Sequence, residues 1–96
     1  MRQTLVVTYD ISDPKRLRRV FRLMQGYGAH VQLSVFRCEL SARELVELKV
    51  RLGEIIHHGE DQVLFIDVGP ADGRAGTAIS AIGRAYEEPD RYALVV

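Results

Sequence analysis

The first extended segment constrains the fold most, because it is apolar on both faces and ends in a carboxylate. Residues 3–9 predict a strand whose side chains alternate, with Leu5, Val7 and Tyr9 on one face and Val6 and Thr8 on the other. Both faces of such a strand need to be covered. Asp10 follows at the C-terminal tip, the end of the strand at which open α/β sheets place their chemistry.

A helix start follows this strand directly. Asp13 predicts an N-cap and Pro14 the first helical residue, where the missing N–H of proline costs no hydrogen bond. One apolar stripe then recurs at helical spacing: Leu17, Val20, Phe21, Met24 and Tyr27. The opposite side carries the cations Lys15, Arg18, Arg19 and Arg22, with Arg16 at its margin. Gly26 and Gly28 predict the end of the helix.

Residues 30–40 are again extended and leave two interpretations open. They form either one long strand or a tight hairpin that turns near Ser34, since no Gly or Asn marks the turn. The alternation sets Val31, Leu33 and Val35 against Gln32, Ser34 and Phe36. We expect Phe36 on the sheet face that points away from the helices.

A second helix opens with a capping box between Ser41 and Glu44. Its apolar stripe is Leu45, Leu48, Leu52 and Ile55. The segment 57–59, His-His-Gly, predicts its end; the two histidines favour the helix C-terminus more than a metal, because neighbours in sequence do not share a helix face. Residues 62–68 then predict another strand that is apolar on both faces.

The remainder of the chain changes character. After Gly69 and Pro70, residues 71–76 predict a loop, 77–83 a short strand and 91–96 a final strand that ends in Ala-Leu-Val-Val. Such an apolar segment is best covered by pairing with the sheet edge of a partner. The order of elements predicts a two-layer sandwich of helices on a sheet, and its second apolar sheet face predicts an isologous homodimer.

Composition sets the class of protein. Ninety-six residues with 47% hydrophobic and 27% charged side chains are typical of one globular domain. We expect no membrane span and no export signal, and hence a cytoplasmic protein. The single cysteine, Cys38, predicts a buried apolar side chain and no zinc site.

The net charge of zero hides an asymmetry that bears on partners. Residues 1–43 hold eight Lys and Arg against three Asp and Glu, whereas residues 44–96 hold five against ten, so the two parts carry +5 and −5. A basic patch of this kind can attract phosphate chains to one face. The plainer interpretation is a solvated helix face.

Asp10 and the cations that follow it form the candidate site. A carboxylate can bind a divalent metal while nearby arginines bind phosphate oxygens. The alternative is that Asp10 caps local backbone donors, but Ser12 and Asp13 already fill that role.

The strand end at Asp10 and the segments that follow it resemble those of a known protein family. The chain resembles the CRISPR-associated endoribonuclease family, the second of the two nearly universal spacer-adaptation proteins, over residues 3–68. The matching features, in order, are 9–13 (Tyr-Asp-Ile-Ser-Asp), the basic run 15–20, 27–28 (Tyr-Gly), 31–36 (Val-Gln-Leu-Ser-Val-Phe), 39–40 (Glu-Leu) and 44–45 (Glu-Leu).

The resemblance implies a ferredoxin-like α+β fold of βαββαβ order, with a core over residues 1–68 and a C-terminal extension over 69–96. It also implies a homodimer with facing sheets and a C-terminal strand that crosses to the partner. Members are magnesium-dependent nucleases of single-stranded RNA or, in some cases, double-stranded DNA, and they join integrase dimers during spacer capture.

By motif position, Asp10 would be the catalytic residue and the Mg²⁺ ligand, paired with its copy in the other subunit. The residues around it that would contact nucleic acid are Tyr9, Arg16, Arg19, Ser34 and Phe36. Leu17 stands where relatives are often basic, so it receives no phosphate role. Two other functions compete with the nuclease: a non-catalytic DNA-binding scaffold that bridges integrase dimers, and a ferredoxin-like metabolite-binding dimer.

Overall fold

The sheet is built around its central strand, β1 (Gln3–Asp10). In the computed structural model, which describes residues 1–73 and 78–87, β1 pairs antiparallel with β3 (Val35–Leu40) on one side and with β4 (Gln62–Pro70) on the other. The edge strand β2 (Gly28–Gln32) pairs with β3, so the order is β2-β3-β1-β4.

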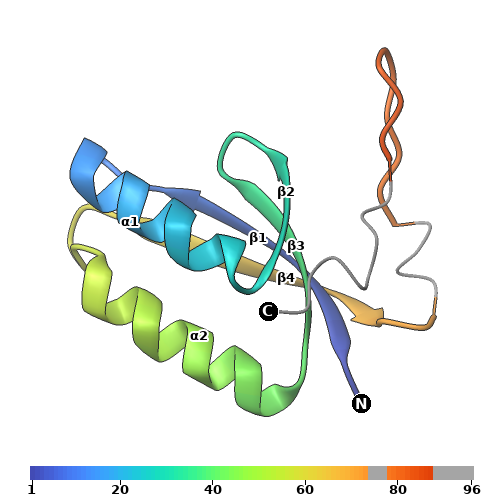
Figure 1. Cartoon of the computed structure of the whole chain (residues 1–96), viewed down its shortest axis with the longest axis horizontal. Coiled ribbons are helices and arrows are strands. Elements are labelled where there is room, and N and C mark those ends of the chain that lie inside the picture. The colour runs from blue at the N-terminus through green and yellow to red at the C-terminus, as the bar shows by residue number, and fades with distance from the viewer. Residues whose placement is uncertain (74–77, 88–96) are drawn as a thin grey trace.

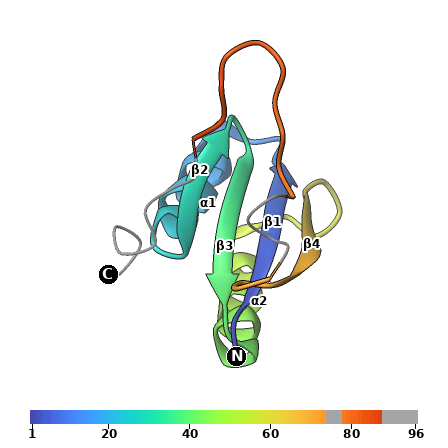
Figure 2. The same cartoon turned by 90° about the vertical axis from the view of Figure 1, so that its right-hand side faces the viewer.

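Two helices cover one face of this sheet, as Figures 1 and 2 show. They are α1 (Pro14–Gln25) and α2 (Ala42–Ile55), and each connects two strands that are not neighbours in the sheet. The βαββαβ order and the antiparallel pairing confirm the predicted ferredoxin-like α+β sandwich.

The core lies between the helices and the sheet, and the alternation of β1 supplies its centre. Leu5, Val7 and Tyr9 are at most 5% exposed, as predicted for the face that meets the helices. From the helices, the stripe residues Val20, Met24, Leu48 and Leu52 are buried against them. Burying each such side chain contributes about 1.5–3 kcal/mol to folding, which explains why the stripes define the helix orientation.

Both predicted helix starts are confirmed. The Asp13 carboxylate accepts hydrogen bonds from the backbone amides of Lys15 and Arg16, each at 3.0 Å. Ser41 and Glu44 form the reciprocal capping box at α2. α2 ends at Ile55, and the ring Nε2 of His58 lies 2.9 Å from the carbonyl oxygen of Gly53 in its last turn.

The segment 30–40 is a hairpin, not one long strand. Leu33 and Ser34 form the turn between β2 and β3, and Leu33 is 89% exposed. The expected place of Phe36 was wrong. Its side chain is fully buried under α1, edge-on to Phe21, because Phe36 shares its sheet face with Cys38 and Leu40 in the core.

The opposite sheet face is apolar and partly open. Thr8 lies opposite Leu64 and Val6 lies opposite Ile66, so these four side chains share one face. Leu64 and Ile66 of β4 are 46% and 47% exposed. This face is therefore the surface that the sequence predicted to bind a second copy of the chain. The homodimer itself stays a prediction.

Beyond β4 the structure differs from the sequence-based prediction. The short strand predicted over 77–83 was wrong in its described part, because residues 78–83 form bends and irregular backbone without a strand. Residues 78–87 project as a loop away from the sheet (Figures 1 and 2), with Ile82 fully exposed. The strand predicted over 91–96 lies outside the described residues. No helix in ranges 1–73 and 78–87 is long and apolar enough to cross a membrane.

Substitutions of two glycines would measure how tightly the chain packs around each of them. A Cβ at Gly28 would lie 2.4 Å from the Arg37 carbonyl oxygen and 2.6 Å from Cys38 Sγ, whereas a Cβ at Gly53 in α2 would meet only His58 Cε1, at 3.8 Å. We expect Gly28→Ala to lower the free energy of unfolding by about 1–3 kcal/mol through overpacking. The matched control Gly53→Ala should raise it by about 0.5–1 kcal/mol. Urea denaturation measures both; equal effects of the two variants would contradict this packing.

Candidate functional site

Asp10 lies where the sequence predicted, at the C-terminal end of β1. Its side chain is exposed, and its strand partner is Gln62, the first residue of β4. By the alternation of the strand it belongs to the same face as Val6 and Thr8, the partly open face described above. In the described part of the chain the Asp10 carboxylate makes no hydrogen bond or ion pair, so both its oxygens are available to a ligand.

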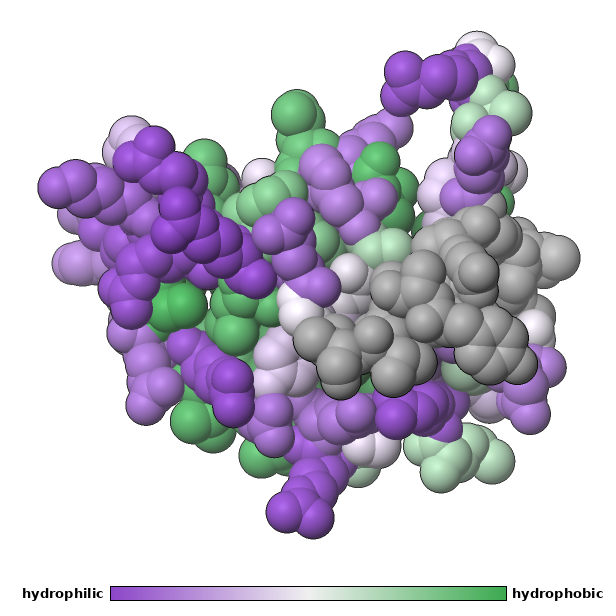
Figure 3. All heavy atoms as spheres, in the orientation of Figure 1, coloured by the Kyte–Doolittle hydropathy of each residue, from purple (hydrophilic) through white to green (hydrophobic). Residues whose placement is uncertain are grey.

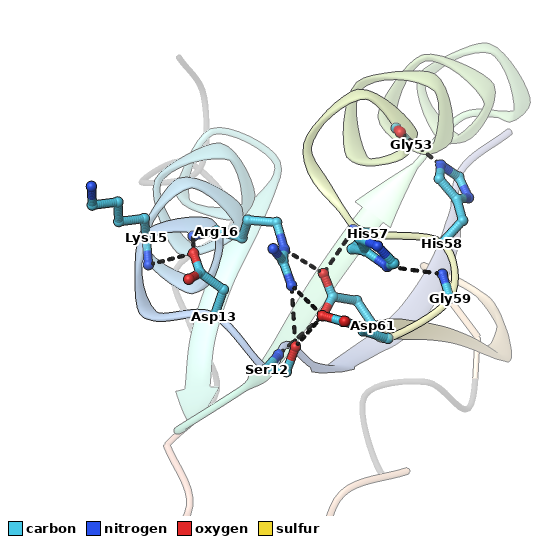
Figure 4. A network of polar contacts seen from close by, with 10 residues as sticks. Ser12, Asp13, Lys15, Arg16, Gly53, His57, His58, Gly59 and Asp61 are labelled. Carbon is cyan, nitrogen blue, oxygen red and sulfur yellow. Dashed lines mark hydrogen bonds and ion pairs between the residues drawn. The ribbon is translucent and has the colours of Figure 1, made fainter.

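A buried carboxylate, Asp61, ties the turn after β1 to the turn before β4 (Figure 4). Its side chain has no exposed surface. Oδ1 accepts from the Ser12 backbone N–H at 3.0 Å and from the Ser12 hydroxyl at 3.2 Å. Oδ2 accepts from Arg16 Nε at 2.8 Å and from the His57 backbone N–H at 2.8 Å.

Arg16 completes what we call the Asp61 network, defined by Ser12, Arg16, His57, Glu60 and Asp61. Its Nη2 donates to Asp61 Oδ1 at 3.3 Å, to the Ser12 hydroxyl at 3.1 Å and to Glu60 Oε1 at 3.4 Å. Hydrogen bonds from the Arg16 guanidinium and from the His57 and Ser12 backbone hold the pKa of Asp61 well below its ordinary value, against the opposing effect of desolvation. In the folded protein the Asp61 carboxylate is therefore ionised at neutral pH.

The network also contains one residue that was expected to contact nucleic acid. The Arg16 guanidinium is hydrogen-bonded to Ser12, Glu60 and Asp61 of the same chain, and its contact with nucleic acid stays a prediction. Arg19 is exposed and makes no ion pair within residues 1–73 and 78–87. Three further cations of α1 are exposed in the same way: Lys15, Arg18 and Arg22. Figure 3 shows hydrophilic side chains gathered over this end of the molecule.

The other predicted contact residues lie around the end of β1, but two of them are buried. Tyr9 is 5% exposed, and its ring stacks on that of Phe36 with the centroids 6.3 Å apart. Burial raises the pKa of the Tyr9 hydroxyl. Phe36 has no exposed surface on which a base could stack. Ser34 is half-buried, and its carbonyl oxygen accepts the Tyr9 N–H at 3.1 Å, so the hairpin turn lies beside the strand end.

At this end of β1, Asp10 is the described residue that could hold a metal. No group of three His, Cys, Asp or Glu side chains suited to a metal occurs in the described ranges. The exposed, unpaired carboxylate of Asp10 is the hard oxygen ligand that Mg²⁺ prefers, and Mg²⁺ commonly uses one or two carboxylates with water and phosphate oxygens. The residues fit such an ion where a second copy contributes its own Asp10.

Local sequence patterns did not reveal Asp61. It precedes a strand as one of two acids in a turn, which is a common place for a solvated carboxylate. Its partner Arg16 lies far away in sequence, in a run of cations that looks uniform. Burial of Asp61 and its distance to Arg16 are the observations that set these two residues apart.

The fold and the site together define a class of protein: a small ferredoxin-like α+β chain whose central strand ends in an exposed carboxylate beside a row of cations. A family model described as CRISPR associated protein Cas2 matches residues 3–74. The chain belongs to this family, as its resemblance indicated.

Relatives support the assignment over most of the chain. The CRISPR-associated endoribonuclease Cas2 of Geobacter sulfurreducens is 38% identical over 96 residues, which is 100% of both chains. A relative of the same name, numbered 1, in Rhodospirillum rubrum is 43% identical over 91 residues, 95% of this chain and 88% of its own. The crystal structure of Streptococcus pyogenes Cas2 matches with a TM-score of 0.73 at 35% identity, covering 83% of this chain and 99% of that one.

The Asp61 network makes a prediction about pH. Because the folded state depresses the pKa of Asp61 from its ordinary value of 3.8, its contribution to stability is present above that value and is lost as the pH falls below about 4. We expect wild-type protein to be more stable than Asp61→Asn at pH 7, and the difference to shrink progressively below pH 4. Urea midpoints of both proteins across this range measure it. A difference that stays constant down to pH 2 would contradict the role of the ionised carboxylate.

Proposed function

We propose that the chain is a magnesium-dependent endonuclease that hydrolyses phosphodiester bonds in single-stranded RNA, with double-stranded DNA as a second substrate, and that it takes part in spacer acquisition with a CRISPR integrase. One observation carries this proposal. An exposed carboxylate with no partner in the described chain stands at the end of the central strand, next to exposed arginines. Relatives named endoribonuclease or endonuclease support the same activity.

In this proposal the carboxylate and the cations of the site have separate roles. Asp10 from each of two subunits would provide the carboxylate oxygens that hold one Mg²⁺. Such an ion would supply stabilisation of negative charge on the phosphate and a more nucleophilic water molecule. Arg19 and the neighbouring exposed cations bind the phosphates on either side and orient the backbone.

The homodimer is part of the proposal, because one chain supplies a single metal-binding carboxylate. The open sheet face carries Asp10 at one end and the exposed Leu64 and Ile66 beside it. Packing this face against its own copy removes apolar surface from water and brings the two Asp10 residues toward each other. A contiguous apolar face is the usual mark of such an interface.

Cleavage of labelled RNA and DNA tests the nuclease. We expect the purified protein to cut single-stranded RNA with Mg²⁺ and not with EDTA, and expect Asp10→Asn, prepared in parallel, to lose at least about 100-fold in rate because the metal loses its protein ligand. Duplex DNA is assayed beside it. Equal cutting by the variant, or none by the wild type, would contradict the nuclease and leave a non-catalytic DNA-binding scaffold, which then still requires salt-dependent DNA binding.

Sedimentation tests the dimer. We expect the wild type to sediment as a dimer at micromolar concentration, and Ile66→Asp to sediment as a monomer because it places a charge in the apolar face. Val50→Asp is the matched control, since Val50 is 58% exposed on α2, away from that face. A monomeric wild type, or a dimer that resists Ile66→Asp but dissociates with Val50→Asp, would contradict the assigned surface.

A further inference from the structure

We propose that Asp61 is a positioning residue for Asp10, that it acts through Arg16 and the Ser12 backbone, and that Arg16 serves this network and not the phosphates of the substrate. The inference deepens the proposed nuclease and rests on it for its catalytic consequence. Its structural claim, that Asp61 fixes the end of β1, can be measured without any activity.

The argument starts from the cost of burying Asp61. A carboxylate with no exposed surface must have its charge and lone pairs satisfied by the protein. Asp61 achieves this with donors from two places: Ser12 and Arg16, which lie after β1 and in the first turn of α1, and the His57 amide in its own segment between α2 and β4. If this segment moved away from Ser12 and Arg16, the Asp61 carboxylate would lose most of its hydrogen bonds.

These contacts bracket Asp10 on both sides. Asp61 is followed directly by Gln62, which lies opposite Asp10 in the sheet. Ser12, whose N–H is held by Asp61 at 3.0 Å, is the second residue after Asp10. The backbone of Asp10 is therefore fixed by the strand pairing before it and by the Asp61 network after it. Since its carboxylate has no partner in the described chain, the backbone position sets the region that its oxygens can reach by rotation of the side chain.

Arg16 is held too firmly to serve as a phosphate contact. It donates from Nε and from Nη2 to Asp61, and it also contacts Ser12 and Glu60. If Arg16 turned to a phosphate, the Asp61 carboxylate would lose the two hydrogen bonds that Arg16 donates to it, and no solvent reaches this side chain to replace them. Arg19, exposed and without an ion pair in the described ranges, has no such commitment.

Kinetics on four single variants and one double variant distinguish positioning from substrate binding. We expect Asp61→Asn and Arg16→Gln each to lower kcat by about 10- to 100-fold, the range for losing support of a metal ligand, with KM for RNA unchanged. The double variant should lose little more than either single one, because both act in one network. Arg19→Gln should instead raise KM and reduce the salt slope of binding by about one. Glu54→Gln, an exposed acid near the end of α2, removes the same charge as Asp61→Asn and should match the wild type.

A second measurement needs no metal and no substrate. Amide hydrogen exchange and backbone order parameters by NMR report on the Ser12 N–H and on Asp10 in metal-free protein. We expect Asp61→Asn to expose the Ser12 N–H to faster exchange and to lower the order parameter at Asp10, with the core strands unchanged. Circular dichroism verifies folding, and Arg16→Gln takes the place of Asp61→Asn if that variant does not fold.

The outcomes separate the two proposals. Tighter RNA binding by Asp61→Asn, or a raised KM in Arg16→Gln, would overturn the inference, because Arg16 would then be a phosphate ligand that Asp61 restrains. Unchanged exchange at Ser12 and unchanged order at Asp10 would overturn it whatever the activity. If the wild type shows no cutting that depends on Asp10, the proposed nuclease fails, while the NMR result still decides whether Asp61 fixes Asp10.

Discussion

Antiparallel pairing of β1 on both of its edges is the constraint on which the rest of the structure depends. With β3 and β4 as neighbours, β1 cannot shift by one residue without moving Leu5, Val7 and Tyr9 out of the core. The same register sets Val6, Thr8 and Asp10 on the other face. A single alternation thus decides both how the helices pack and on which side the candidate metal ligand lies.

A second constraint acts where the pairing of β1 ends. Strands fray at their ends, and a carboxylate at such a place has a poorly defined position unless something fixes the chain beyond it. The Asp61 network supplies this with a charged group that is buried and hydrogen-bonded on both oxygens. The side chains of the basic run after β1 therefore differ in their surroundings: Arg16 is hydrogen-bonded to Asp61, and Arg19 is exposed to solvent.

The parts of the fold that sequence could predict are those governed by neighbours along the chain. Caps such as Asp13 and Ser41 satisfy donors within three residues, and the helix stripes depend on spacing alone. Placing Asp10 at a strand end needed no more than the length of an apolar run. The family resemblance then supplied what spacing could not, namely the hairpin within residues 30–40 and hence the βαββαβ order of elements.

The rest depended on contacts between distant segments. Phe36 was assigned to the wrong face because Leu33, an apolar residue in the hairpin turn and 89% exposed, made Val31, Leu33 and Val35 resemble a core-facing set. No local pattern links Asp61 to Arg16. Residues 78–83 are rich in Ala and Ile, yet apolar side chains alone do not form a strand where no neighbouring strand offers hydrogen bonds.

The central place of β1 also has a consequence for how the chain acquires its structure. The first strand to be synthesised is hydrogen-bonded on one edge to β3 and on the other to β4, the last strand of the sheet. During translation β1 therefore stays incompletely paired, with apolar side chains on both faces, until β4 has left the ribosome. The hairpin β2-β3 is local and can form first. The sheet gains its β4 edge only when the segment that carries Asp61 arrives, so the Asp61 network that holds the chain beyond Asp10 cannot form before then.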